Sequence, residues 1–361
     1  MKKRSLKQRQ NETLKIGIIL GILFFLFALF ISGSHLVHQR AVDRLREELN
    51  KQPYKVPLEP GNDRLIEWND MALEQDIRRI LKKEEGDIYL SDLWDYNTLY
   101  LVREPGFDDP GVDAVGNTIK DISCLSGLEN LKTLFLTAND ITDIAAIGAM
   151  KNMVKLSLGG NPVQDISPIA SLTELYYLNL NSMNLKGEDL NYLSNLKNLR
   201  MLELNFNENE NLHALCNLQL SGLFLERNQI SDISPLTGLK ETLLYLNLDT
   251  NQIADIEPLT EAGSLRYLSL EHNFITDIKA LEQLNKLCFL CLTDNEIRSL
   301  PDFSGMSSLT RLYLADNDIT TEEWKKIKLP MCSIQVNISG NPITDLETEQ
   351  DYPNLQVIFD Y

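Results

Sequence analysis

Hydrophobic residues recur along most of the chain at a spacing of about 22 residues. From Leu131 onward the pattern is L-x-x-L-x-L-x-x-N-x-I-x-D-I-x-x-L. Copies begin at positions 131, 153, 175, 199, 220, 243, 265, 287, 309 and 333. Ten copies at a nearly constant spacing exclude a chance match, and a period of this length is typical of solenoid proteins.

Each copy predicts a short strand, a turn and a return segment. The leucines at the fourth and sixth positions lie on one side of an extended chain, so they point into a shared core. No single copy can bury that face, and neighbouring copies must therefore stack. We predict an α/β repeat: a right-handed leucine-rich-repeat solenoid, or horseshoe, with a parallel concave sheet. The short repeat leaves room for a 3₁₀ or irregular convex side.

The asparagine at the ninth position of the pattern is polar where its surroundings are apolar. The turn after each strand leaves buried backbone groups unpaired, and a buried amide can both donate to them and accept from them. We interpret these residues as a structural ladder: Asn139, Asn161, Asn207, Asn228, Asn251, Asn273, Asn295, Asn317 and Asn341. The Asp of the following Asp-Ile pair suits the cap of the return turn.

An earlier copy of the repeat is split by an insertion. Leu99 and Leu101 fit its strand, the pattern resumes at Asn117, and residues 104–116 lie between them. The insertion carries acidic residues at positions 108, 109 and 113, but their spacing matches no recognised calcium loop. Its Gly and Pro residues favour a projecting loop. We predict no metal site and no cofactor.

Residues 69–83 show the period of an amphipathic helix. Asn69 or Asp70 is the expected N-cap, and Gly86 is expected to end the helix. The apolar stripe consists of Leu73, Ile77, Ile80 and Leu81. A helix in this position covers the apolar edge of the first repeat, as a solenoid requires in order to stay soluble.

The first 34 residues divide by charge. Residues 1–15 hold six bases and one acid, a net charge of +5, and residues 16–34 are uncharged and largely apolar. As a helix, residues 16–34 span roughly 27–30 Å, about a bilayer core. The apolar core of a cleaved signal peptide is shorter, about 7–15 residues. We therefore favour an uncleaved transmembrane signal anchor; a cleaved one would make the protein secreted. The basic flank favours a cytoplasmic N-terminus.

The expected organisation has five parts. These are a basic cytoplasmic tail (1–15), a transmembrane signal anchor (16–34), a stalk helix with a Pro-rich linker (35–63), a helical cap (64–98) and the leucine-rich repeats (99–361).

Composition narrows the function further. The chain of 361 residues has 34 Lys and Arg and 52 Asp and Glu, for a net charge of −18. This acidic balance argues against nucleic acid as a partner, because nucleic-acid binding needs a basic surface. A hydrophobic content of 43% excludes general disorder. Five cysteines are too few for a disulfide framework.

Candidate catalytic groups are sparse. His35 and His38 lie beside the anchor. His272 is the only plausible base for Cys291, and their spacing does not indicate a catalytic pair. Cys288 and Cys291 form C-x-x-C, but residues i and i+3 of a strand point to opposite faces, so one metal ion cannot bind both. No phosphate-binding or dinucleotide-binding motif occurs. We predict that the protein is not an enzyme.

The residues that flank the inner leucines face outward on the concave side. Tyr245, Tyr267 and Phe289 come from consecutive copies, and the acids at positions 226, 249 and 271 run parallel to them. Exposed aromatics are common in interfaces, and carboxylates favour a partner with Lys or Arg. The alternative is that these aromatics only stabilise the sheet. The predicted partner-binding face consists of Tyr177, Glu203, Phe224, Glu226, Tyr245, Asn247, Asp249, Tyr267, Glu271, Phe289, Arg311 and Tyr313.

The cap sequence 70–81, the Gly86-Asp87-Ile88 that follows it and the D-I-x-x-L-x-x-L spacing resemble bacterial internalin-type proteins over residues 66–361. The resemblance implies a capped leucine-rich-repeat domain in a surface or secreted protein that binds host or envelope partners. This chain departs from the best-known members in having an apolar N-terminal segment and no C-terminal wall-sorting motif or Ig-like domain. Eukaryotic phosphatase-regulating repeat proteins share the repeat length, but they are intracellular and lack an anchor.

We therefore predict a single-pass protein of a bacterial cell membrane, with its repeats outside the cytoplasm. Its expected function is to bind a protein or peptide through the concave face, as in adhesion, envelope recognition or scaffolding. The carboxylates of that face favour a partner with basic residues. Two alternatives are a structural component of an envelope or secretion assembly and an intracellular regulatory scaffold.

Overall fold

The structure is a computed structural model that describes residues 57–59, 61–103, 118–344 and 355–358. The chain divides into two compact units, Met1–Lys55 and Val56–Tyr361. All the described residues belong to the second unit. The predicted tail, anchor and stalk (1–50) and the insertion (104–116) lie outside the described residues. Within those residues, no helix has the length and apolar character needed to cross a membrane.

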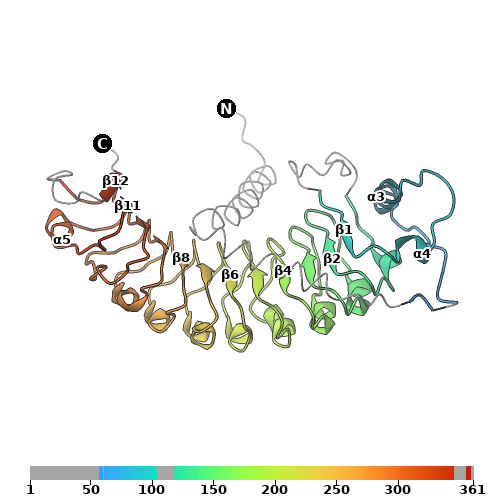
Figure 1. Cartoon of the computed structure of the whole chain (residues 1–361), viewed down its shortest axis with the longest axis horizontal. Coiled ribbons are helices and arrows are strands. Elements are labelled where there is room, and N and C mark those ends of the chain that lie inside the picture. Colours follow the sequence, from blue (N-terminus) through green and yellow to red (C-terminus); the bar gives the residue numbers. More distant parts are fainter. Residues whose placement is uncertain (1–56, 60, 104–117, 345–354, 359–361) are drawn as a thin grey trace. The chain divides into compact units, whose positions relative to one another are not determined.

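In the described residues, twelve parallel strands form one sheet, in which each strand pairs with its neighbours in the sequence (Figure 1). The strands are β1 (Thr98–Tyr100), β2 (Thr133–Phe135), β3 (Lys155–Ser157), β4 (Tyr177–Asn179), β5 (Met201–Glu203), β6 (Gly222–Phe224), β7 (Tyr245–Asn247), β8 (Tyr267–Ser269), β9 (Phe289–Cys291), β10 (Arg311–Tyr313), β11 (Ile334–Asn337) and β12 (Leu355–Ile358). This sheet confirms the predicted leucine-rich-repeat solenoid. Strand β12 was not expected, because the recognised pattern stops with the copy at 333.

The core consists of leucines stacked from one repeat to the next. Leu246 on β7 pairs in register with Leu268 on β8, which pairs with Leu290 on β9, and all three are fully buried. The leucine two residues further along each chain, such as Leu248, is buried as well. Each repeat can exclude water from these side chains only by packing against its neighbours, which makes the array cooperative between adjacent repeats.

Short 3₁₀ turns lie on the side opposite the sheet (Figure 1). They span Ser123–Leu125, Ala145–Ala149, Ser167–Ser171, Asp189–Leu193, His213–Leu215, Ser234–Leu239, Glu257–Leu259 and Lys279–Gln283. The Asp of the Asp-Ile pair holds the start of most of these turns. The side chain of Asp165, for example, accepts hydrogen bonds from the backbone N–H and the hydroxyl of Ser167, both at 2.8 Å. A one-turn helix α5 (Thr321–Trp324) replaces the 3₁₀ turn before β11.

The N-terminal cap contains helix α3 (Met71–Leu81) and the short helix α4 (Leu90–Leu93). Asp70 is the N-cap of α3 and accepts from the backbone N–H of Leu73 at 2.9 Å. The other carboxylate oxygen of Asp70 accepts from the N–H of Lys120 at 2.7 Å, which ties the cap to the first repeat. Helix α3 ends at Leu81, five residues before Gly86, because Lys82 adopts the left-handed conformation and its N–H bonds back to the last turn.

Helix α3 buries Leu73 and Ile77, while Ile80 and Leu81 are only partly buried. Asp76 is also buried on this face, which the apolar stripe did not indicate. It forms an ion pair with Arg103, which follows β1 and is buried too. Buried carboxylates need such a partner, because an unpaired charge in a core is costly. The pair joins the cap to the split repeat.

The asparagine side chains connect adjacent repeats. The Nδ2 atom of Asn251 donates to the carbonyl of Leu248 at 3.0 Å in its own repeat and to that of Leu225 at 2.9 Å in the preceding repeat. Its Oδ1 atom accepts from the N–H of Ile230 at 3.1 Å, also in the preceding repeat. Thr250, the residue before it, has a φ of 54°. This left-handed turn directs backbone groups inward, where only a side-chain amide can pair both the donors and the acceptors.

One repeat lacks this asparagine and carries Met183 in its place. Asn207 of the next repeat compensates: its Oδ1 atom accepts from the N–H groups of both Met183 and Leu185 at 3.0 Å. Its Nδ2 atom still reaches back to the carbonyl of Leu180 at 2.9 Å. Two residues of this turn, Ser182 and Asn184, have positive φ. The ladder is therefore continuous across the missing position.

Replacing Asn251 with Ala should destabilise the repeats by roughly 2–4 kcal/mol, because two buried carbonyls and one buried N–H lose their partner. Urea unfolding followed by circular dichroism measures the change. The control is Asn217→Ala, since Asn217 is exposed; it should stay within about 0.5 kcal/mol of wild type. Equal unfolding midpoints for the two variants would contradict a structural role for the ladder.

Candidate functional site

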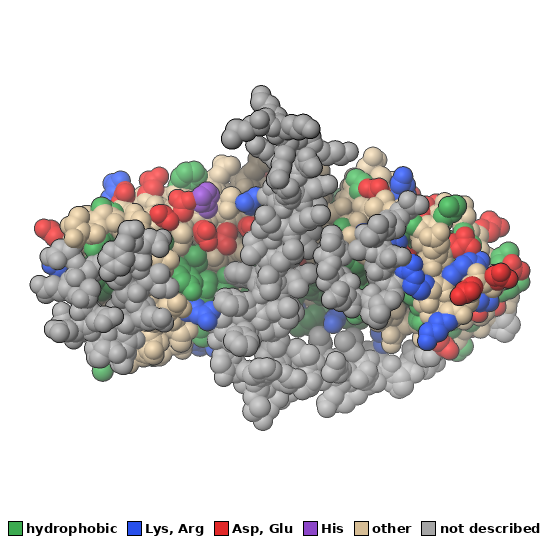
Figure 2. All heavy atoms as spheres, turned by 90° about the horizontal axis from the view of Figure 1, so that it is seen from above, with side chains coloured by type: hydrophobic (Ala, Val, Ile, Leu, Met, Phe, Trp, Pro, Cys, Tyr) green, Lys and Arg blue, Asp and Glu red, His purple; other side chains and the backbone are tan. Residues whose placement is uncertain are grey.

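The sheet presents three columns of outward-facing side chains on its concave side. The first column includes Tyr245, Tyr267, Phe289 and Arg311, which are register partners on β7 to β10. The second column lies two residues further along each strand, and the third lies just after the strand ends. Figure 2 shows acidic and apolar side chains gathered on the C-terminal half of this face. The structure places every predicted partner-binding residue in one of these columns.

The C-terminal aromatic cluster consists of Tyr267, Phe289 and Tyr313. The rings of Tyr267 and Phe289 are stacked with their centroids 4.4 Å apart, and Phe289 meets Tyr313 edge-on at 5.4 Å. Tyr267 and Phe289 are only 4% and 6% exposed. The expectation of exposed aromatics is therefore wrong for these two, because stacked rings cover each other. Tyr313 and the neighbouring Tyr245 are partly exposed.

Phe224, on β6 next to Tyr245, is also partly exposed and lies beside a gap in the first column. A Cβ atom at Gly222 would meet the Met201 side chain at 2.6 Å and the Phe224 ring at 3.3 Å. Glycine at position 222 therefore leaves room for both side chains to lie across β6. Arg311, at the other end of the column, is partly buried.

Glu203 is held inside the protein by its neighbours. Its Oε1 atom accepts from the hydroxyl of Tyr177 at 3.0 Å, and its Oε2 atom accepts from Nδ2 of Asn181 at 2.9 Å. Burial raises the pKa of the Glu203 carboxyl, and these two hydrogen bonds lower it in part. Because both oxygens are engaged, Glu203 and Tyr177 stabilise the sheet and offer a partner little free hydrogen-bonding capacity.

The third column is a second ladder, which runs along the sheet. Asn181 Oδ1 accepts from the N–H of Asn205 at 2.7 Å, and Asn205 Oδ1 accepts from the N–H of Glu226 at 2.8 Å. Asp249 Oδ1 likewise accepts from the N–H of Glu271 at 2.7 Å. Asn247, at the end of β7, supports the column by accepting from the N–H of Asp249 at 2.8 Å. The amide side chains of this column therefore hold the backbone of the next repeat, while its carboxylates also place negative charge on the concave face.

The acidic row consists of Glu226, Asp249 and Glu271, three members of the third column. Burial raises the pKa of Asp249 to about 7; a hydrogen bond from Ser269 lowers this pKa, and the nearby charges of Glu271 and Glu226 raise it. Burial also raises the pKa of Glu226, against the lowering effect of Arg227, whose Nε lies 3.8 Å from Glu226 Oε1. Like charges at close range disfavour ionisation. A cation bound here would relieve that repulsion.

Glu271 is the most available acid of this row. Its side chain belongs to an exposed residue, and Cys291 Sγ approaches its Oε2 atom at 3.7 Å. Arg227, which partly neutralises Glu226, also lies over the ring of Phe206, 5.3 Å from its centroid. That contact holds the guanidinium at the border of the acidic row.

A second aromatic cluster was missed in the sequence. It consists of Tyr100, Phe135 and Tyr177 on β1, β2 and β4, and we call it the N-terminal aromatic cluster. The rings of Tyr100 and Phe135 meet edge-on at 5.2 Å, and those of Phe135 and Tyr177 lie 6.1 Å apart. Tyr100 is 38% exposed. The available signal was the register of the split repeat, which puts Tyr100 in the same column as Phe135.

The thiol and imidazole groups do not form a catalytic pair. His272 is exposed and its Nδ1 atom pairs with Asp294. Cys291 is buried, and burial raises the pKa of its thiol to about 12. Cys288 Sγ lies 3.6 Å from the carbonyl of Lys286, outside β9. In the part of the chain that the structure describes, no three His, Cys, Asp or Glu side chains form a group that could hold a metal ion.

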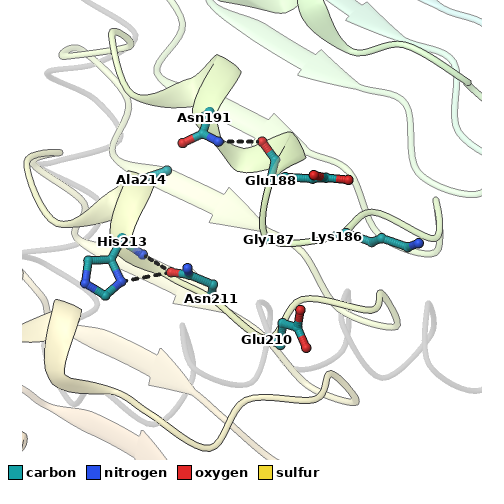
Figure 3. A pocket seen from close by; sticks show the side chains of 8 residues that line it. All are labelled: Lys186, Gly187, Glu188, Asn191, Glu210, Asn211, His213 and Ala214. Carbon is teal, nitrogen blue, oxygen red and sulfur yellow. Dashed lines mark hydrogen bonds between the residues drawn. The ribbon is translucent and has the colours of Figure 1, made fainter.

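A polar pocket of about 360 Å³ lies between two 3₁₀ turns, away from the concave face (Figure 3). Its lining residues are Lys186, Gly187, Glu188, Asn191, Glu210, Asn211, His213 and Ala214. Asn211 Oδ1 accepts from the backbone N–H of His213 at 2.8 Å, as Asp does in the capped turns of other repeats, and lies 2.9 Å from His213 Nδ1. Lys186 and Glu188 point away from His213. These groups do not converge on a common point, as a catalytic or binding centre requires.

Comparisons with known proteins agree with this architecture. A family model described as "Leucine rich repeat" matches residues 263–319. The chain is similar to an internalin (inlF) from Listeria monocytogenes, with 27% identity and a TM-score of 0.60, covering 81% of this chain and 96% of that one. It is also similar in fold to the functional domain of InlJ from Listeria monocytogenes, with 20% identity and a TM-score of 0.60, covering 84% and 72%. The sequence matches no curated protein.

The fold is that of a leucine-rich-repeat protein, and the chain is similar to internalins. Proteins with this fold are typically interaction scaffolds that bind other proteins and are not enzymes. Their stacked repeats form an extended concave surface, which is the part of a solenoid generally used for binding.

The raised pKa of Asp249 predicts a pH-dependent stability. The folded carboxyl has a pKa of about 7, against an ordinary value of 3.8, so the unfolded state releases its proton first as pH rises. Stability is then lost as pH rises from about 4 to about 7. Asp249→Asn keeps the Oδ1 acceptor and should stabilise the protein by roughly 2–4 kcal/mol at pH 8, and by little at pH 4.5. Thermal unfolding at the two pH values measures this difference.

Asp165→Asn is the matched control with the opposite sign. The hydrogen bonds from Ser167 lower the pKa of the exposed Asp165 carboxyl. Its contribution to stability is therefore present above the unfolded pKa and is lost as pH falls through the folded one. This variant should lower the melting temperature at pH 8. If Asp249→Asn and the wild type have equal melting temperatures at pH 8, the charged Asp249 carboxylate does not destabilise the folded state.

Proposed function

We propose that this protein is a binding scaffold whose concave face, near residues 203–313, takes up a protein or peptide that presents Lys or Arg side chains. One observation carries the proposal: the acidic row of Glu226, Asp249 and Glu271 runs along a rigid sheet directly beside partly exposed aromatic side chains. Aromatic anchors supply most of the energy of typical interfaces, and complementary charges supply orientation and selectivity.

The scaffold is well suited to such binding because its side chains are held in place before a partner arrives. The second ladder fixes the backbone beneath the acidic row through the bonds from Asn205 and Asp249. Little conformational freedom then remains to be lost on association, which favours affinity. Repulsion within the row, which contributes to the raised pKa values of Glu226 and Asp249, would fall when a cationic side chain binds.

We also propose that the repeats lie outside the cytoplasmic membrane of a bacterial cell, held there by an anchor at residues 16–34. Support comes from the sequence: an uncharged apolar segment long enough to span a bilayer follows a tail of net charge +5. The remaining residues carry a net charge of −23, which keeps an extracytoplasmic domain soluble. Cleavage after this segment would release the same domain as a secreted protein.

The charge reversals Glu226→Lys and Glu271→Lys, combined in one chain, should reduce partner capture at least tenfold. Capture is measured by incubating the full-length chain with envelope proteins and quantifying the proteins enriched over a bead control. The melting temperature should not fall, because both acids lie in a repulsive row. Glu174→Lys, at an exposed position between a 3₁₀ turn and β4, is the matched control. Undiminished capture by the double variant would refute the acidic row as the binding surface.

Protease shaving of intact cells tests the proposed location. The repeats should be cleaved or released when cells are treated from outside, while a cytoplasmic marker protein stays intact. Tight packing protects the repeats themselves, so the readout is loss of full-length chain through cleavage in the Pro-rich linker at 52–61. A full-length chain that survives in intact cells but is cleaved after lysis would place the repeats inside the cell.

A further inference from the structure

The concave face carries two aromatic clusters that lie far apart. The N-terminal aromatic cluster lies on β1, β2 and β4, and the C-terminal aromatic cluster lies on β8, β9 and β10. Both face the same side of one sheet, since Tyr100, Phe135 and Tyr313 occupy the second column. A compact hydrophobic contact would need only one of them. Their separation is therefore informative about the size of the partner.

The separation follows from the strand order. Phe135 lies on β2 and Phe289 on β9, which are seven strand-to-strand steps apart in an uninterrupted parallel sheet. With neighbouring strands about 4.8 Å apart, the two rings are roughly 34 Å from each other along the sheet. An extended peptide rises about 3.3 Å per residue, so about ten residues are needed to reach from Phe135 to Phe289.

The surface between the clusters differs in chemistry from its two ends. It holds Glu203 on β5 and then the acidic row that follows β6 to β8. Glu203 is occupied by Tyr177 and Asn181, and Glu226 is partly neutralised by Arg227. Asp249 and Glu271 remain as the acids with no cationic partner among the described residues. The middle of the face also carries the partly exposed Phe224 on β6 and Tyr245 on β7, so the acids are confined to the part of the face between the two clusters, while aromatic side chains run along its whole length.

We propose that the partner is an extended polypeptide segment of about ten or more residues, with apolar or aromatic residues at both ends and Lys or Arg between them. This inference rests on the binding function proposed above and specifies its partner. Each end of the segment would pack against the accessible part of one aromatic cluster, which is Tyr100 and Phe135 at one end and Tyr313 at the other. The basic middle would face Asp249 and Glu271. Two anchors joined by one chain bind more tightly than either anchor alone, because the second contact is intramolecular.

Synthetic peptides test this arrangement on the full-length chain. The main probe has twelve residues, with two Phe at each end, three Arg in the middle and Ser elsewhere. Comparison peptides replace the Phe pair at one end with Ser, shorten the peptide to six residues, or replace Arg with Glu. Fluorescence anisotropy at low salt measures each affinity. The two-ended peptide should bind at least tenfold more tightly than either one-ended peptide, and the Glu version should not bind.

Variants assign the ends to the clusters. In Phe135→Ala, the two-ended and one-ended peptides should bind with equal affinity, because one anchor site is lost. Tyr100→Ala, at a more exposed position of the same cluster, should act in the same direction if Phe135→Ala fails to fold. The control is Tyr192→Ala, since Tyr192 is a 42% exposed aromatic on a 3₁₀ turn away from the sheet; it should keep the tenfold ratio.

The outcomes separate this inference from the function on which it rests. If one-ended, six-residue and two-ended peptides bind equally well, and Glu271→Lys still abolishes binding, the two-anchor arrangement is refuted and the acidic binding face stands. If no peptide binds, or if Glu271→Lys changes none of the affinities, both proposals are refuted. Retention of the tenfold ratio in both Phe135→Ala and Tyr100→Ala would refute the N-terminal aromatic cluster as an anchor.

Discussion

The hydrogen bonds of the asparagine ladder are the interaction on which the rest of the structure depends. Each repeat turns sharply after its strand, at a residue such as Thr250 with positive φ, and buries backbone groups that need partners. One amide satisfies groups in its own repeat and in the repeat before it, as Asn251 does. Adjacent turns are thereby held in register, and the leucines behind them can stack without gaps. The substitution by Met183 is tolerated because Asn207 takes two N–H groups.

This constraint also explains why the concave face is available for binding. The core is filled by the inner leucines and the turns are held by asparagines, so the outward columns are not required to bury apolar area. Some of them nevertheless take structural roles. Glu203 bonds to Tyr177 and Asn181, while Glu271, in the third column, stays exposed. Acidic residues with similar positions in the repeat thus differ in what they can offer a partner.

The periodic features were predictable from the sequence, and the irregular ones were not. The strand positions and the membership of each outward column follow from local alternation along a strand, which any one repeat reveals. The burial of Tyr267 and Phe289 depends on how two rings from different repeats are oriented. Helix α3 ends where Lys82 adopts a left-handed conformation, whereas the sequence predicted that the helix would end at Gly86. Strand β12 lacks the recognised pattern, and Tyr100 was hidden by the insertion that follows it. The anchor at 16–34 stays a prediction, since it lies outside the described residues.

The sequence by itself determined the solenoid, its parallel sheet and the side of the sheet on which each residue lies, because these follow from a pattern repeated every 22 residues or so. Only the tertiary structure decided which acids are engaged, which aromatics are covered and where the two aromatic clusters lie. Such contacts join residues about twenty or more positions apart, as between Tyr177 and Glu203, and they depend on side-chain orientation across strands. Periodicity brings those residues side by side but does not specify which atoms meet.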